Sequence, residues 1–94
     1  MTFEEFMNLE VGAGVEFDGY TGSVTDITDV LKGSVIREDG IAFRNEKTYR
    51  ELTLKCFIPS CNGFRYYFPK IYTDYPDCIH NKMILSSIKI LRLF

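Results

Sequence analysis

Short stretches in which apolar and polar side chains alternate recur along the chain about every ten residues. Successive side chains of a β-strand point to opposite faces, so this alternation is typical of a strand with one buried face. The stretches are 15–17, 23–30, 35–37, 41–44, 49–58, 64–68 and 83–94. No segment between them supplies the crossover helices that parallel strands need. The pattern predicts a mainly β fold of six or seven short antiparallel strands, arranged as a small barrel or a curved sheet.

Glycine-containing turns separate the early strands. The segment Asp18–Gly22 follows the first strand, and Asp39-Gly40 stands between two strand-like runs, which is a strong hairpin signal. Residues 15–24 follow the outline Val-x-Phe-x-Gly-x-x-Gly-x-Val. This outline resembles the first hairpin of many SH3-like small barrels. The resemblance implies an SH3-like form for the predicted barrel.

The two ends of the chain predict different elements. Thr2 and Glu5 have the spacing of a capping box, which predicts a short helix over about 3–9 ahead of a barrel or sheet over about 11–94. In the last segment, 83–94, Ile88 and Ile90 alternate with Lys89, which predicts a strand with a bulge rather than a helix. An apolar strand at a sheet edge favours self-association through this C-terminal strand.

The composition fits one globular domain spanning residues 1–94. Of these, 46% are hydrophobic and 26% charged, and no linker or repeat divides them. The apolar runs are shorter than the about 20 residues of a membrane helix. The acidic start lacks the basic-then-apolar pattern of a signal peptide, and three cysteines do not make a disulfide scaffold. We therefore expect a soluble, cytoplasmic protein without a membrane partner.

Charge is unevenly distributed along the chain. Residues 1–31 hold seven acidic side chains and no Lys or Arg, whereas residues 32–94 hold eleven basic and six acidic ones, for a net charge of −2. We expect the two parts to fold against each other and to complement each other locally. The alternative is a bipolar surface suited to a partner with its own polarity.

Three cysteines and the only histidine are the candidates for a metal site. Thiolates and imidazole are the ligands of a closed zinc site, and they occur here as Cys56, Cys61, Cys78 and His80. The spacing is unfavourable, because Cys56 and Cys61 would face opposite sides of a regular strand. The preferred interpretation is a buried Cys56, a turn Cys61 and a loop Cys78, with no metal. A small zinc-stabilised domain is the third functional hypothesis.

The sequence offers little for catalysis. One histidine without a nucleophile elbow makes no Ser-His-Asp set, and Cys78 lies too close to His80 for the two side chains to meet easily. Asp74 and Asp77 lie in a turn-like context, and Gly12-x-Gly14 lacks the third glycine of a dinucleotide loop. We therefore predict no catalytic residue, no cofactor and no enzymatic activity.

Aromatic and basic side chains concentrate between Leu52 and Tyr75. Alternation places Phe64, Tyr66 and Phe68 inward and leaves Arg65 and Tyr67 outside. Tyrosine and arginine are enriched at the centres of protein interfaces. The lead hypothesis is non-catalytic binding of another protein, as an inhibitor or adaptor of the kind that phages and mobile elements encode. The candidate partner-binding residues are Arg50, Phe57, Arg65, Tyr67, Lys70, Tyr72 and Tyr75.

The same aromatic and basic residues support an alternative hypothesis, the binding of single-stranded nucleic acid. Cations would meet phosphates, and bases would stack on the rings. The pI of about 5.3 weighs against it, because such affinity grows with the number of phosphates neutralised.

Overall fold

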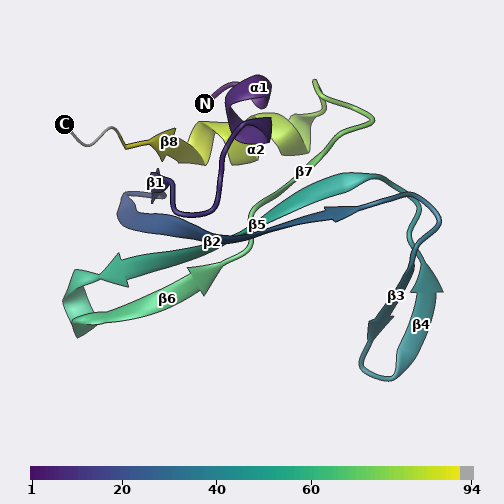
Figure 1. Cartoon of the computed structure of the whole chain (residues 1–94), viewed down its shortest axis with the longest axis horizontal. Coiled ribbons are helices and arrows are strands. Elements are labelled where there is room, and N and C mark those ends of the chain that lie inside the picture. Colours follow the sequence, from purple (N-terminus) through teal and green to yellow (C-terminus); the bar gives the residue numbers. More distant parts are fainter. Residues whose placement is uncertain (92–94) are drawn as a thin grey trace.

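The protein is described by a computed structural model that covers residues 1–91. Strands dominate, and two helices lie near the ends of the chain (Figure 1). The elements are α1 (Phe3–Met7), β1 (Gly14–Phe17), β2 (Tyr20–Val30), β3 (Val35–Glu38), β4 (Ile41–Arg44), β5 (Tyr49–Ile58), the 3-10 turn η1 (Pro59–Cys61), β6 (Gly63–Tyr67), β7 (Lys70–Tyr72), α2 (Ile79–Ser87) and β8 (Ile88–Ile90).

The main sheet is antiparallel, with the strand order β6-β5-β2-β1-β8. The β7 strand pairs with the first residues of β5, and β6 pairs with its last ones. Between them, the carbonyl of buried Pro69 accepts the Leu52 N–H, but proline has no N–H to continue the ladder. The sheet path does not return on itself, so residues 1–91 form a curved open sheet. The predicted antiparallel sheet is confirmed, and the described residues contain no closed SH3-like barrel.

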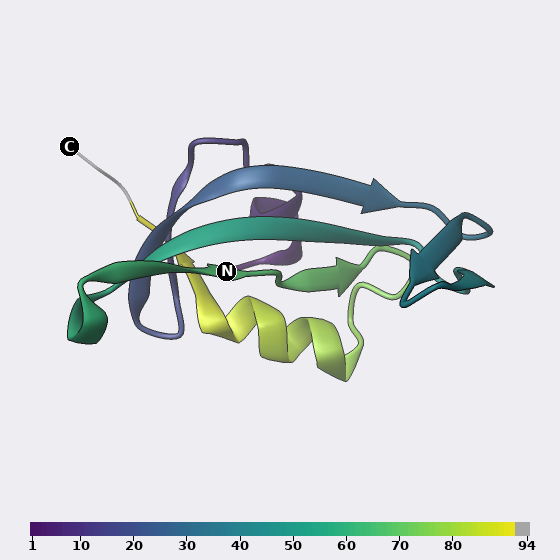
Figure 2. The same cartoon turned by 90° about the horizontal axis from the view of Figure 1, so that it is seen from below.

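Two short helices lie on the same side of this sheet. Figure 1 shows α1 and α2 together above β2 and β5, and Figure 2 shows α1 behind these strands and α2 beside them, next to β7. Phe6 of α1 and Leu85 of α2 pack against the buried residues of the strands. On β5 these are Leu52, Leu54, Cys56 and Ile58, the face that the alternation predicts.

The N-terminal helix forms as predicted. The Glu5 N–H donates to the Thr2 hydroxyl at 3.0 Å, and the Thr2 N–H donates to the Glu5 carboxylate at 2.9 Å, which completes the capping box. A helix of five residues is too short to be stable alone, so its burial of Phe6 against the sheet holds it in place.

The predicted strand over 83–94 is wrong for its first part. Residues 79–87 form helix α2, and only Ile88–Ile90 form a strand. Residues 92–94 lie outside the described chain. The helix is favoured because Asn81 and Leu85, four residues apart, both turn into the interior. Helical periodicity therefore governs this segment, and the alternating residues begin only where the helix ends.

The β3–β4 hairpin stands apart from the main sheet (Figure 1). Asp39 and Gly40 both have positive φ, at 51° and 77°, as a two-residue turn of this hand requires. The predicted hairpin is confirmed. Every residue of β4 is exposed, and the described core takes no residue from 31–48. The hairpin is therefore an arm whose apolar side chains, Val35, Ile41 and Phe43, are exposed.

Candidate functional site

The uncovered face of β5 and β6 carries a group of exposed rings, which we call the aromatic face: Phe57, Phe64 and Tyr66, with Lys55. Phe57 lies opposite Phe64 in the strand register, and Lys55 lies opposite Tyr66. The two phenylalanine rings meet edge to face at 5.7 Å, and the Lys55 ammonium lies 4.5 Å from the Phe64 ring centre. Phe64 is 62% and Tyr66 52% exposed. Such exposure of neighbouring rings is typical of an interaction surface.

The predicted orientation of β6 is wrong. Tyr67 lies opposite Leu54, and Arg65 opposite Cys56, so both belong to the face of the sheet that carries the core, although Arg65 is exposed there, as predicted. The Tyr67 ring packs on the core and lies 5.2 Å from the Phe17 ring, whereas Phe64, Tyr66 and Phe68 are exposed. The turn sets this register: η1 is followed by Asn62 in a left-handed conformation, with φ at 50°. Turn geometry therefore overrides the apolar pattern of the strand.

The backbone and the charge of this region add to the aromatic face. The β6 strand is at one end of the sheet order, so one edge of its backbone faces away from β5. Residues 52–73 contain three basic side chains, Lys55, Arg65 and Lys70, and no acidic one. The edge strand and its rings therefore belong to a segment of the chain whose charged side chains are all basic.

Arg50 has an internal role. Its guanidinium donates to both carboxylate oxygens of Asp29, at 2.7 and 2.9 Å, and to the Met7 carbonyl at 2.7 Å. The hydrogen bonds from Arg50 hold the pKa of Asp29 below its usual range. Arg50 thus joins the end of α1 to β2 and β5, and its bonding capacity is largely used inside the molecule.

The candidates Tyr72 and Tyr75 meet in a second place, which we call the Tyr72 pocket. It encloses about 360 Å³ and is lined by Lys47, Tyr72, Tyr75, Cys78 and His80. Strand β7 supplies Tyr72, and the start of α2 supplies Cys78 and His80. The His80 ring lies 5.1 Å from the Tyr72 ring, and its Nε2 is 2.8 Å from the Lys70 carbonyl. The sequence pattern gives no signal for the part that Lys47 plays, because it lies in a polar loop.

The three cysteines lie in three different environments. Cys56 is buried in the core, where burial raises the pKa of its thiol. Cys61 is exposed in η1, and Cys78 is half-buried at the start of α2. Within residues 1–91, no three side chains of His, Cys, Asp or Glu come together in a way that could hold a metal ion.

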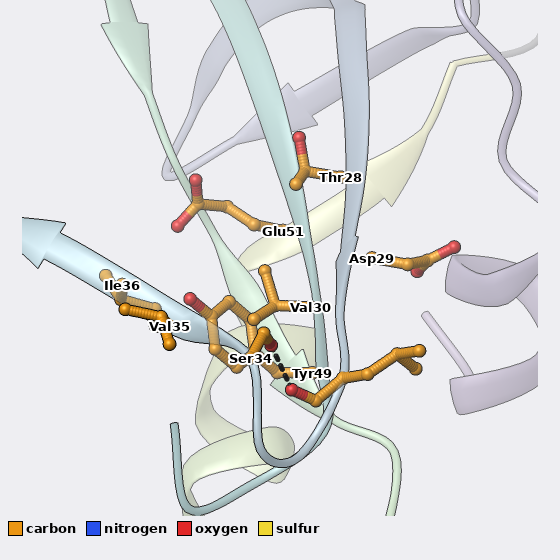
Figure 3. Close-up of a pocket in the computed structure, with 9 residues that line it drawn as sticks. Thr28, Asp29, Val30, Ser34, Val35, Ile36, Tyr49 and Glu51 are labelled. Carbon is orange, nitrogen blue, oxygen red and sulfur yellow. Dashed lines mark hydrogen bonds between the residues drawn. The ribbon is translucent and has the colours of Figure 1, made fainter. Parts of the chain in front are cut away.

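A third hollow, of about 540 Å³, lies where the β3–β4 hairpin leaves the sheet (Figure 3). Val30 and Tyr49 form its floor beside Glu51, and Ser34 and Val35 form the side toward the hairpin. The Ser34 hydroxyl donates to the Leu31 carbonyl, so it is held by the backbone rather than by a base. This hollow presents mainly apolar surface and contains no pairing of a nucleophile with a histidine.

Comparison with protein-family models, with curated proteins and with solved structures finds no match for this chain. In the described part of the chain, no helix is long and apolar enough to cross a membrane. The assignment of function therefore depends on the geometry of these surfaces.

Proposed function

We propose that this protein is a non-catalytic binding module that holds an extended, acidic segment of another protein along β6. The observation that carries the proposal is the aromatic face beside the outer edge of this strand. An extended segment can pair with a free strand edge through main-chain hydrogen bonds, and exposed side chains then select its sequence. A domain of this kind acts as an adaptor or an inhibitor, because it occupies the segment of the partner protein that it binds.

The chemistry of the partner segment follows from the charge of the site. Residues 52–73 carry three basic side chains and no acidic one, so acidic residues on the partner would gain attraction and basic ones would be repelled. Exposed Phe64 and Tyr66 favour large apolar side chains at alternate positions of the segment. The expected ligand is therefore a strand that alternates apolar with acidic residues.

Selection from a displayed library of random linear peptides tests this proposal. We expect the selected peptides to be enriched in Asp or Glu and in apolar residues, and to shift the amide resonances of β5 and β6. A Phe64→Ser/Tyr66→Ser double variant should lose this binding, because both exposed rings are removed. The matched control is Ile41→Ser/Phe43→Ser, which removes two exposed apolar side chains from β4 and should bind normally. Enrichment of basic peptides, or equal loss in both variants, would overturn the proposal.

Binding of single-stranded nucleic acid is the second candidate function, and the exposed rings of Phe57, Phe64 and Tyr66 beside Lys55 favour it. Bases stack on such rings, and phosphates meet the cations. Titration with a thymidine oligonucleotide at low and high salt separates the two functions. Nucleic acid would be the better assignment if oligonucleotide binding weakens at high salt and is lost in the Phe64→Ser/Tyr66→Ser variant, while no acidic peptides are selected.

Self-association through the C-terminal strand stays a prediction. The β8 strand is at the other end of the sheet order and pairs with β1, and Ile90 is 36% exposed. Sedimentation at high concentration tests it, with Ile90→Lys as the variant that should remain monomeric.

A further inference from the structure

Two ammonium groups share one tyrosine ring at the Tyr72 pocket. Lys47 Nζ lies 4.8 Å and Lys70 Nζ 6.0 Å from the centre of the Tyr72 ring. Lys70 Nζ also lies 4.8 Å from the ring of Tyr49, which meets Tyr72 edge to face at 6.3 Å. These separations are within the range of cation–π attraction, so the rings gather positive charge at one place.

This positive charge has no carboxylate partner in the described chain. The ion pairs within residues 1–91 are Asp29–Arg50 and Glu16–Lys89, and neither includes Lys47 or Lys70. Glu51 lies opposite Lys70 in the β5–β7 register but forms no ion pair with it. Lys47 and Lys70 therefore bring positive charge to the Tyr72 ring without forming an ion pair within residues 1–91, and such charge attracts an anion.

Acidic side chains flank the pocket in sequence: Glu46 directly precedes Lys47, and Asp74 and Asp77 belong to the neighbouring loop, 73–78. The Asp74 carboxylate accepts the Thr48 N–H at 3.3 Å, and Asp74 and Asp77 line a separate hollow that shares Tyr75 and Cys78 with the Tyr72 pocket. The lining of the Tyr72 pocket itself contains no Asp or Glu. An anion in the pocket would therefore meet Lys47 and His80 rather than a carboxylate.

Hydrogen bonds from the buried Asn81 side chain hold the backbone of the residues that line the pocket. The Tyr72 N–H donates to Asn81 Oδ1 at 2.8 Å, and Asn81 Nδ2 donates to the carbonyls of Tyr72, Tyr75 and Pro76 at 2.7, 3.2 and 3.3 Å. These bonds join β7, the loop and α2 into one unit. A volume of about 360 Å³ is at the small end of ligand pockets and suits a single ring with one charged group.

We propose that the Tyr72 pocket binds a small aromatic acid, an aryl phosphate or an aryl carboxylate. The oxyanion lies beside Lys47, which lines the pocket and binds it as a point charge, and the ring packs against Tyr72 and Tyr75. Lys70 does not line the pocket, and it adds positive charge from its place near the Tyr72 ring. This site is separate from the aromatic face, whose residues do not line the pocket. The inference therefore does not depend on the proposed function.

Titration of the protein with phenyl phosphate, followed by amide resonances, tests the site. We expect saturable shifts at Lys47, Tyr72, Cys78 and His80, with a dissociation constant of about 1 mM or tighter. Benzoate, titrated in parallel at the same ionic strength, distinguishes a carboxylate ligand from a phosphate ligand. Phenol and inorganic phosphate test the two halves of the ligand, and each should bind at least about tenfold more weakly than the better aromatic acid.

Charge-removing variants locate the binding. Lys47→Gln should weaken phenyl phosphate binding by about tenfold, Lys70→Gln, which removes a charge near the Tyr72 ring but outside the lining, by less, and the double variant by more than either. Lys89→Gln is the control, because it removes one lysine from β8, outside the pocket, and should bind normally. The Phe64→Ser/Tyr66→Ser variant should also bind phenyl phosphate normally, so the anion site and the proposed peptide-binding function can be tested independently.

Three results would overturn the inference. One is the absence of saturable shifts with both aromatic acids, and another is equal binding of phenol, which carries no oxyanion. The third is an equal loss of affinity in the Lys89→Gln control and in the Lys47→Gln variant, which would show attraction to net charge alone.

Discussion

Asn81 is the only buried polar side chain in the described part of the chain, and its amide serves both as acceptor and as donor. Asn81→Ala removes the partner of the Tyr72 N–H and of the Tyr72 and Pro76 carbonyls, whereas the Tyr75 carbonyl still accepts the Cys78 N–H at 3.1 Å. We expect a loss of about 2–3 kcal/mol in the free energy of unfolding, because unsatisfied buried polar groups keep their full desolvation cost. Urea denaturation followed by circular dichroism measures it.

The control for this substitution is Asn8→Ala, at an exposed asparagine that ends α1. It should change stability by less than about 0.5 kcal/mol. If the two variants unfold at the same urea concentration, the Asn81 bonds do not stabilise the fold.

Asp29 gives the fold a dependence on pH. Because Arg50 lowers the pKa of Asp29 in the folded state, the pair stabilises the protein at pH values above the ordinary aspartate range, near 4. This contribution is lost as the pH falls through the lowered folded pKa. Asp29→Asn should cost up to about 1 kcal/mol at pH 7, since the carboxylate is half exposed, and close to nothing at pH 2.

Urea denaturation of the wild type and Asp29→Asn at both pH values checks this expectation. Asp77→Asn is the control, because neither ion pair within residues 1–91 includes Asp77. A cost of Asp29→Asn that is the same at pH 7 and pH 2 would contradict the role of the ion pair.

At the scale of elements, the contact between β2 and β5 depends on a glycine. A Cβ atom at Gly22 would lie 2.6 Å from both Cys56 Sγ and the Lys55 carbonyl, and 2.9 Å from Cys56 Cα. Two of these atoms belong to backbone, which cannot move aside without disturbing the strand pairing. Gly22→Ala should therefore reduce the free energy of unfolding by about 1–3 kcal/mol, measured by chemical denaturation.

Gly14→Ala is the matched control in the neighbouring strand β1. There a Cβ would meet the Leu91 side chain at 3.6 Å, an ordinary contact. It should leave stability within about 0.5 kcal/mol of the wild type. Equal destabilisation by the two alanines would show that loss of glycine from a strand, rather than the close approach of β5, is responsible.

The elements differ in how far the sequence determines them. Alternation predicts both ends of β5 correctly, and the Asp39-Gly40 turn predicts the β3–β4 hairpin, because both signals are local. Helix α2 is missed because its N-cap, Cys78, makes no side-chain capping bond. Its stability comes from the bonds of Asn81 to the backbone of residues 72–76 and from the packing of Leu85 in the core, which the pattern of the segment itself does not contain. The face of β6 is missed because the turn before it, and not its own pattern, sets the register.

At the scale of the whole molecule, the uneven charge of the chain is partly neutralised by folding. Both ion pairs of the described residues, Asp29–Arg50 and Glu16–Lys89, join the acidic first part of the chain to the basic second part. The expectation of local complementarity is confirmed for these pairs. Neither ion pair includes a residue of the acid-free segment 52–73, so its basic side chains are not neutralised by these pairs.

The candidate site is predicted only in outline. The region 52–75 is the one that the sequence indicates, and it contains the aromatic face. The individual residues differ, because Tyr67 faces the core, Arg50 is engaged by Asp29, and Phe64 and Tyr66 are the exposed rings. The contribution of Lys47 to the Tyr72 pocket depends on tertiary proximity, which no local pattern contains.

The β3–β4 arm should be dispensable for folding, because the described core takes no residue from 31–48. Val30 and Tyr49 are paired at the end of the β2–β5 ladder, so a two-residue turn can connect the strands just beyond them. Replacing residues 32–47 by Asn-Gly should leave a cooperative unfolding transition and unchanged resonances for β1 and β8, which lie away from the arm. Loss of the cooperative transition would show that the arm stabilises the sheet.

The distribution of the three cysteines equips the molecule with its own reporters. Burial raises the pKa of the Cys56 thiol and withholds it from alkylating reagents. Cys61 is exposed at the turn between the strands of the aromatic face, and Cys78 lines the Tyr72 pocket. A fluorophore coupled to Cys61 would sense arrival of a partner, while protection of Cys78 from alkylation would record a ligand in the pocket. Cys78→Ser leaves Cys61 for the fluorophore and Cys61→Ser leaves Cys78 for alkylation, so both sites can be followed separately without introducing a new thiol.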